Sequence, residues 1–165
     1  MKKVFLLMAV ALVSLTASAQ FYAGGSLGFW NDDDADETAF FIAPEVGYNL
    51  NEKWSVGLEL GYFNEDAVGV ATFAASPYAR YTYFNQDRLS LFVDGGFGFS
   101  YKDQDNDETG FNIGLQPGVA VSLTEKFSLV AKFGFLGYND KYLNAKDGFG
   151  LNLTNNISFG FYVNF

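Results

Sequence analysis

The chain has no cysteine and no histidine among its 165 residues, and only three prolines. Without cysteine, an exported protein of this size has no disulfide bond, so backbone pairing and side-chain packing must stabilise it. Without histidine, no serine has an evident base partner, and the sequence contains neither a phosphate loop nor a cluster of metal ligands. Basic residues are also few, 10 against 19 acidic ones, which argues against nucleic acid as a partner. We therefore expect no enzymatic activity and no cofactor.

Long apolar stretches are absent after the N-terminal segment. Lys2 and Lys3 precede an apolar run over residues 4–15, and Ala17-Ser18-Ala19 matches a small-residue cleavage site. These features predict a secretory signal peptide over residues 1–19, which is too short for a membrane-spanning helix. The single domain expected over residues 20–165 would carry a formal charge of −11, because the signal peptide takes two lysines from a chain of charge −9. No cysteine follows the cleavage site, so a lipid anchor is not expected.

The sequence repeats itself after about seventy residues, which indicates an internal duplication. GGSLGF at residues 24–29 resembles DGGFGF at residues 94–99, and PEVGYNLNEKW at 44–54 resembles PGVAVSLTEKF at 117–127. Each copy holds about four expected strands, near residues 21–84 and 89–165, and eight strands are enough to close a small barrel.

Apolar and polar residues alternate with a period of two through most of residues 20–165, which predicts strands. The strands are expected near residues 21–30, 39–50, 54–63, 71–84, 89–101, 111–123, 127–138 and 149–165. In the seventh of these, one face carries Phe127, Leu129, Ala131, Phe133 and Phe135, and the other carries Ser128, Val130, Lys132 and Gly134. Tight turns alternate with longer polar loops, the layout of outer-membrane barrels.

The three prolines each fall in an expected strand that leads into a short turn. They are Pro44, Pro77 and Pro117. Each removes one backbone donor from the hydrogen-bond ladder, and a closed barrel has no free edge where that loss is harmless. We therefore expect a β-bulge near each of them.

Side-chain size decides which face of the barrel points inward. One face is dominated by Phe, Leu, Val and Tyr, and the other by glycine, serine, asparagine and a few charges. The interior of an eight-stranded barrel is narrow and is just filled by side chains, so repeated phenylalanines would overfill it. The bulky face must therefore point outward into lipid, where closure satisfies the backbone hydrogen bonds. We expect an all-β fold, an eight-stranded antiparallel up-and-down transmembrane β-barrel.

With these features, residues 20–165 resemble the small eight-stranded outer-membrane barrels, the porin-like family that includes the OmpA transmembrane domain and OmpX. In that family, a last strand of alternating apolar residues with a terminal phenylalanine is read by the barrel-assembly machinery. The resemblance therefore implies an assembly signal at Ile157, Phe159, Phe161, Val163 and Phe165. It also implies a location in the outer membrane of a Gram-negative-type bacterium, among membrane lipid and lipopolysaccharide.

Five charged residues fall on the inward face, each about seven residues from a short turn: Glu45, Glu59, Arg80, Asp94 and Lys132. We expect them in one layer of the lumen, where isolated charge would be costly. Glu45 and Glu59 should face each other across a hairpin, with Arg80 between them through bidentate contacts, while Lys132 pairs across the lumen. Two interpretations stay open: an ion-pair plug that closes the lumen and fixes the register, or a gated ion path in which the pairs re-form.

Two expected loops form an acidic rim. Its members are Asp32, Asp33, Asp34, Asp36, Glu37, Asp103, Asp105, Asp107 and Glu108. The second loop matches positions one, three and five of an EF-hand, but Glu108 and Gly114 stand where the motif needs glycine and glutamate, so the motif fails. One interpretation is a loose bridge of divalent cations to lipopolysaccharide phosphates, and the other is a solvated, self-repelling rim.

Together these observations predict a non-enzymatic outer-membrane barrel with a closed lumen, which serves membrane structure or surface interaction through short acidic loops. One alternative is a small porin-like channel for ions or solutes. A third possibility is a secreted soluble barrel that binds an apolar ligand, against which the narrow, charged lumen and the terminal phenylalanine argue.

Overall fold

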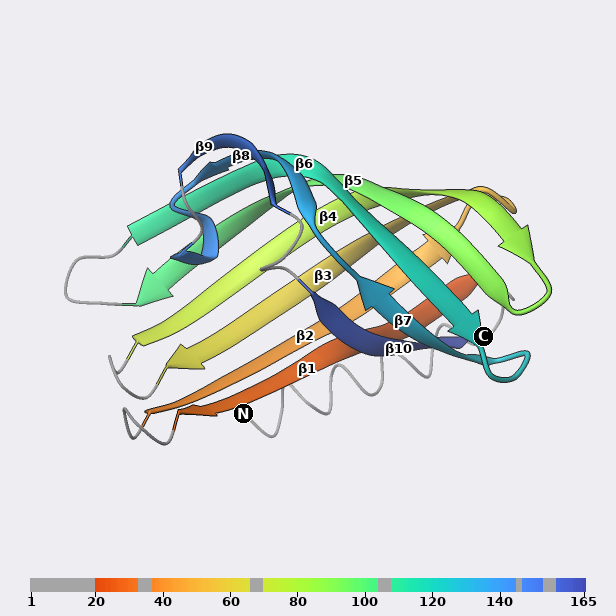
Figure 1. The fold of residues 1–165 in the computed structure, drawn as a ribbon, viewed down its shortest axis with the longest axis horizontal. Helices are drawn as coiled ribbons and strands as arrows, with labels where there is room; N and C mark the ends of the chain where they lie inside the picture. Colours follow the sequence, from red (N-terminus) through yellow and green to blue (C-terminus); the bar gives the residue numbers. More distant parts are fainter. Residues whose placement is uncertain (1–19, 33–36, 66–69, 104–107, 145–146, 153–156) are drawn as a thin grey trace.

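The computed structural model describes residues 20–32, 37–65, 70–103, 108–144, 147–152 and 157–165 (Figure 1). These residues form ten strands and one short 3₁₀ helix. The strands are β1 (Phe21–Asp32), β2 (Glu37–Asn49), β3 (Trp54–Glu65), β4 (Val70–Gln86), β5 (Leu89–Asp103), β6 (Glu108–Ser122), β7 (Phe127–Lys132), β8 (Phe135–Asp140), β9 (Gly148–Asn152) and β10 (Ser158–Asn164), and the helix is η1 (Tyr142–Asn144). Within these segments, no helix has the length and apolar character of a membrane span. The expected signal peptide over residues 1–19 lies outside the described residues.

The strands close into a barrel. β1 to β6 each pair antiparallel with the next strand in sequence. β7 and β8 both pair with β6 and together form the seventh barrel strand, while β9 and β10 form the eighth. β10 pairs with β1 over Tyr22–Ser26, which closes the sheet. The prediction of an eight-stranded antiparallel up-and-down barrel is therefore confirmed; the internal duplication stays a prediction.

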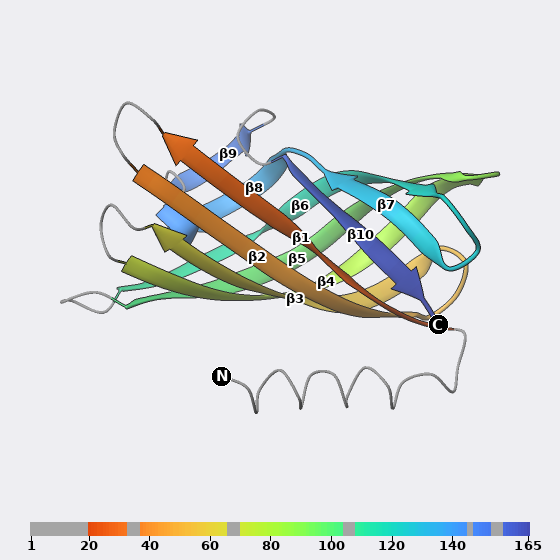
Figure 2. The ribbon, with the colours of Figure 1, turned by 90° about the horizontal axis from the view of Figure 1, so that it is seen from below.

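The tight turns lie at one end of the barrel, together with the C-terminus, and the strand ends that border residues 33–36, 66–69 and 104–107, where the sequence predicts longer loops, lie at the other (Figure 2). We call these the short-turn end and the long-loop end. Two of the tight turns are held by the same pattern of side-chain hydrogen bonds, in which one oxygen accepts from the amides two and three residues later. Asn51 Oδ1 accepts hydrogen bonds from the Lys53 and Trp54 amides, and Thr124 Oγ1 accepts them from the Lys126 and Phe127 amides. Such local bonds replace ladder bonds where the chain reverses.

The bulky face points away from the lumen, as predicted. Leu129, Phe133 and Phe161 are 48%, 40% and 41% exposed, whereas the neighbouring Ser128 and Lys132 are both 6% exposed. A continuous apolar surface of this kind is unusual for a protein in water and suits contact with hydrocarbon.

A bulge in the seventh barrel strand corrects one part of the predicted alternation. Between the pairs Leu115–Leu136 and Gly118–Lys132, two residues of β6 face three residues of the other strand. Pro117 has no amide proton to donate there, although its carbonyl accepts from the Phe133 amide at 3.0 Å, and Gly134 adopts a φ of 70°. The extra residue shifts the phase, so Phe135, expected on the lipid face with Phe133, instead lines the lumen.

The other two prolines interrupt the ladder without a bulge, so the prediction of bulges near Pro44 and Pro77 is wrong. The register between β2 and β3 is the same on both sides of Pro44, and the register between β4 and β5 is the same on both sides of Pro77. At each proline the hydrogen-bonded pairing between the two strands is interrupted for two residue pairs and then continues in the same register. A separate bulge lies between Thr82 and Phe84, closer to the turn after β4.

Inside the barrel, large aromatic residues stand opposite glycines. The directly paired positions are Tyr22–Gly47, Gly57–Tyr78, Phe92–Gly118 and Gly24–Tyr162. A Cβ atom on any of these four glycines would collide with the ring opposite or beside it. Glycine therefore provides the space that allows four aromatic rings to fit into a narrow lumen. Three of these rings, those of Tyr22, Phe92 and Tyr162, belong to the buried core with Val130.

Candidate functional site: a charged layer across the lumen

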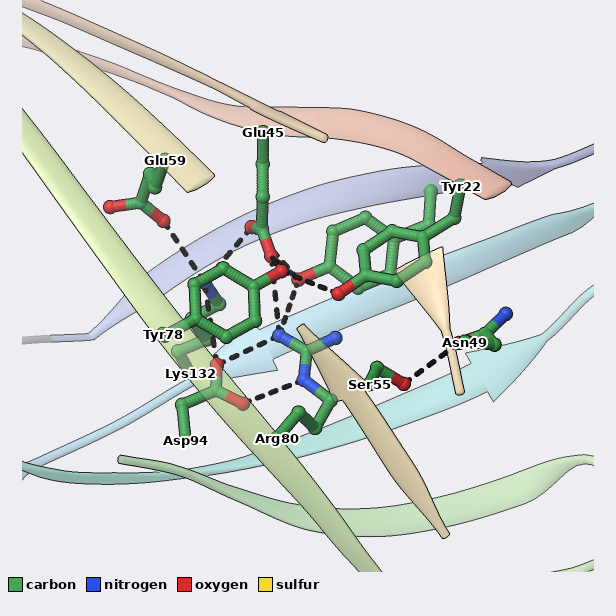
Figure 3. A network of polar contacts seen from close by, with 10 residues as sticks. Tyr22, Glu45, Asn49, Ser55, Glu59, Tyr78, Arg80, Asp94 and Lys132 are labelled. Carbon is green, nitrogen blue, oxygen red and sulfur yellow. Dashed lines mark hydrogen bonds and ion pairs between the residues drawn. The ribbon is translucent and has the colours of Figure 1, made fainter. Parts of the chain in front are cut away.

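The five charged residues expected in the lumen lie together in the structure, in a group that we call the charged layer: Glu45, Glu59, Arg80, Asp94 and Lys132 (Figure 3). They come from β2, β3, β4, β5 and β7, so the layer joins both halves of the sequence. Strand register places two pairs directly opposite each other, Glu45 with Glu59 and Arg80 with Asp94.

Lys132 lies at the centre of the three carboxylates. Its Nζ is 2.9 Å from Glu45 Oε2, 2.9 Å from Glu59 Oε2 and 3.6 Å from Asp94 Oδ2. Two facing carboxylates repel each other unless a cation lies between them. In this barrel that cation comes from across the lumen, on a side chain that is itself buried.

Arg80 makes a different set of contacts from the one expected. Its Nε and Nη2 donate to the two oxygens of Asp94 at 2.6 and 2.8 Å, a bidentate pair, and Nη2 lies 3.3 Å from Glu45 Oε1. The expectation that Arg80 bridges Glu45 and Glu59 is therefore wrong, because Lys132 contacts both glutamates. The reason is the register: Asp94 stands directly opposite Arg80 and occupies its guanidinium.

Three tyrosines complete the layer, and sequence reasoning missed them. Tyr162 Oη lies 2.8 and 2.9 Å from the two oxygens of Glu45 and accepts a hydrogen bond of 2.9 Å from Arg80 Nη2. Tyr78 donates to Glu45, and its hydroxyl is 2.5 Å from that of Tyr22. In the described part of the chain, every buried side-chain nitrogen and oxygen has a hydrogen-bond partner. The signal that could have found these tyrosines is their inward phase opposite a glycine.

Stacking rings also hold the guanidinium in place. The central carbon of Arg80 lies 3.9 Å from the ring centroid of Phe92 and 5.1 to 5.7 Å from the centroids of three tyrosine rings. Cation–π contacts of this kind gain strength when the cation is removed from water. The layer is therefore a packed plug of rings and ion pairs.

The layer separates two cavities. The outer cavity, of about 420 Å³, lies toward the long-loop end, and its floor includes Glu59, Asp94 and Lys132. The inner cavity, of about 490 Å³, lies toward the short-turn end, where Arg80 and Tyr162 belong to its wall. None of the described residues lines both cavities. The charged layer is thus the partition between them.

The segment after β8 folds into the outer cavity. Tyr142 in η1 is buried, and its hydroxyl lies 2.7 Å from Ser76 Oγ on β4. Leu143 beside it also lines the cavity and has a φ of 49°. Next to this turn, Lys141 forms an exposed ion pair of 2.9 Å with Glu108, whose hydrogen bond and charge raise the pKa of the lysine.

The other predicted site residues are placed as follows. Phe159 and Phe161 are exposed on the lipid face, and Val163 and Phe165 are half-buried near the short-turn end. Ile157, just before β10, is exposed and borders the outer cavity. Of the acidic rim, Asp33, Asp34, Asp36, Asp105 and Asp107 lie outside the described residues. Only the backbone is described for Asp32, Glu37 and Asp103, which leaves Glu108, paired with Lys141. Among the described residues, no group of three or more acidic side chains is arranged to hold a metal ion.

Comparison with solved structures finds the same fold. The N-terminal β-barrel domain of Pseudomonas aeruginosa OprF has a TM-score of 0.62 and 15% identity, covering 90% of this chain and 98% of that one. Neisserial surface protein A (NspA) has a TM-score of 0.59 and 16% identity, with the same two coverages. These likenesses show the fold alone. Comparison with curated protein sequences gives no match.

The family described as outer membrane protein beta-barrel domain matches residues 4–165, in agreement with the resemblance seen in the sequence. The chain therefore belongs to the outer membrane protein β-barrel family.

Proposed function

We propose that this protein is a non-enzymatic outer-membrane barrel whose lumen is closed by the charged layer, and that it serves membrane structure or surface interaction at its long-loop end. The observation that carries the proposal is the partition of the lumen. The two cavities meet at ion pairs and hydrogen bonds among residues with side chains mostly 3 to 8% exposed. A hydrated ion would have to separate these pairs to pass, and separating buried pairs is costly.

The chemistry of the layer also supports a role without catalysis. Carboxylates that act as general acids or bases need a free oxygen near a substrate. Here Glu45 and Asp94 are buried and already bind a lysine, an arginine and two tyrosine hydroxyls. The chain also has no histidine or cysteine to supply a nucleophile or a base near neutral pH.

Membrane lipid is the partner that the outward apolar face and the family support most directly. We further propose lipopolysaccharide as a neighbour of the acidic rim, with loosely bound divalent cations between phosphates and carboxylates. The assembly machinery is proposed to read the terminal strand, where Phe159 and Phe161 are exposed at 69% and 41%. Export by a cleaved signal peptide belongs to the same proposal.

Planar-bilayer recording tests the closed lumen. The purified barrel, inserted into a neutral phosphatidylcholine bilayer in molar potassium chloride, should show no unitary current steps. The variant Lys132→Ala, recorded under the same conditions, should show unitary current steps, because it removes the cation that neutralises three carboxylates. Regular steps from the wild-type barrel would contradict the proposal, and the barrel would then be a channel.

One observation favours the channel as the second candidate. Lys132 has three carboxylates within 3.6 Å, so its ammonium can exchange partners without leaving the layer. A channel of this kind would open under voltage by re-pairing of Lys132. Steps that appear only above a threshold voltage, and that vanish in Lys132→Met, would support this candidate.

A further inference from the structure

The charged layer carries an excess of negative charge. Glu45, Glu59 and Asp94 are balanced by Arg80 and Lys132 alone, which leaves a formal charge of −1 among the five. Charge of this kind inside a narrow barrel is unfavourable unless a further cation comes close to it. The arrangement of the five residues shows where that cation has access.

The excess charge is accessible at Glu59. Its side chain is 31% exposed, whereas the side chains of the other four members are 3 to 8% exposed. Glu59 reaches one cation, Lys132, through Oε2, and that lysine is shared with Glu45 and Asp94. Figure 3 shows Glu59 at the margin of the network, while Glu45 lies within it. Glu59 is therefore an incompletely neutralised carboxylate on the floor of the outer cavity.

The wall above this floor is aromatic. Phe41 and Phe63 stack with their ring centroids 5.0 Å apart, and both line the outer cavity. Phe135 reaches the same cavity because of the bulge at Gly134, and Tyr142 enters it from η1. Aromatic faces attract cations, and aromatic edges pack against apolar groups.

The size of the outer cavity limits its ligand. A volume of about 420 Å³ is within the range of small-molecule sites, roughly 300 to 1,000 Å³. Lys132 at the floor does not make this a site for anions, because its ammonium is already surrounded by three carboxylates and is buried. The free charge at the floor of the site is acidic, and the rest of its surface combines aromatic rings with neutral polar side chains such as Asn112, Gln116 and Asn139.

We propose that the outer cavity binds a small organic cation, a primary ammonium group on an aromatic or short aliphatic body. The ammonium contacts Glu59 at the floor, and the apolar body lies among Phe41, Phe63 and Phe135. This site concerns the outer half of the lumen only, so it is independent of whether the charged layer blocks ions.

The test uses the full barrel in phosphatidylcholine nanodiscs, which carry no net lipid charge, and isothermal titration with phenethylammonium. We expect saturable binding that is at least about tenfold weaker for 2-phenylethanol, the neutral probe of the same shape, a difference of about 1.4 kcal/mol. Glu59→Gln should weaken phenethylammonium binding by a similar factor. The matched control Glu52→Gln removes a carboxylate that lines the inner cavity and should leave binding unchanged.

Equal binding of the amine and the alcohol would overturn the proposal, because it would indicate partition into lipid or apolar contact alone. Unchanged binding in Glu59→Gln would also overturn it. A second measurement needs no variant: in the wild-type barrel, the ring protons of the bound amine should give nuclear Overhauser contacts to Phe41, Phe63 or Phe135. A saturated sample without such contacts would contradict the assignment of the site even if Glu59→Gln failed to fold.

Discussion

Replacement of Arg80 by methionine tests whether the charged layer stabilises the barrel through paired charge. Methionine keeps an apolar stem of similar length against Phe92, so the change removes mainly the guanidinium. Arg80 donates two hydrogen bonds to Asp94 and one to the hydroxyl of Tyr162, and it lies 3.3 Å from Glu45. All of these acceptors are buried and cannot recover the lost contacts from bulk water.

The magnitude follows from the charges that are left behind. After the substitution, Asp94 keeps only Lys132, at 3.6 Å, and that lysine must balance three carboxylates. Breaking one partner out of a buried pair costs about 3–5 kcal/mol. We therefore expect Arg80→Met to lower the free energy of unfolding by about 3–5 kcal/mol.

The assay is reversible urea unfolding in phosphatidylcholine vesicles, followed by fluorescence of the two tryptophans. The second variant Arg80→Met/Asp94→Asn removes the stranded charge as well. If the cost arises from that charge, the double variant should be more stable than Arg80→Met by about 1–3 kcal/mol. Single-variant stability within about 0.5 kcal/mol of wild type would refute the reasoning, and so would a double variant less stable than the single one.

Three further predictions concern the backbone and the long-loop end. Gly57→Ala should lower the free energy of unfolding by about 1–3 kcal/mol in the urea assay, because the new methyl group meets the ring of Tyr78. Gly150→Ala, which has open space around its Cβ position, should change that free energy little. Gly134→Ala forces a side chain onto a φ of 70° and should cost about 1–2 kcal/mol, measured by urea unfolding; an unchanged midpoint would argue against the bulge. Glu108 raises the pKa of Lys141, so their pair stabilises the fold below the ordinary lysine pKa, and this stabilisation is lost as pH rises through the raised value. An NMR titration should show the Lys141 pKa falling in Glu108→Gln, and an unmoved value would exclude the pair.

The alternation of bulky and small residues was sufficient to predict the barrel and to predict which face of each strand points into the lumen. A strand has a period of two, so bulky and small residues separate onto two faces, and only one of those faces fits a narrow lumen. Counting positions from the short turns also named five charged residues that the structure places in contact. Both inferences depend on spacing along a single strand, which the sequence contains directly.

What the sequence did not reveal depends on the register between paired strands. The phase of Phe135 is reversed by one extra residue opposite Pro117, and only the pairing of two strands shows where that residue is accommodated. The choice of Lys132 over Arg80 as the bridge depends on which residue stands opposite each cation. A proline signals a lost donor, but it does not signal whether the ladder skips or bulges at that point.

The most direct test of the central claim is a depth measurement on neighbouring residues of the seventh and eighth barrel strands. The chain has no cysteine, so single cysteines at Ser128, Leu129, Ser158 and Phe159 can each carry a nitroxide label. Labels at Leu129 and Phe159 should show high collision rates with oxygen dissolved in the bilayer, and labels at Ser128 and Ser158 should be shielded from it. High oxygen access at the two serine positions, with shielding at their apolar neighbours, would place the charged layer in lipid and contradict the account.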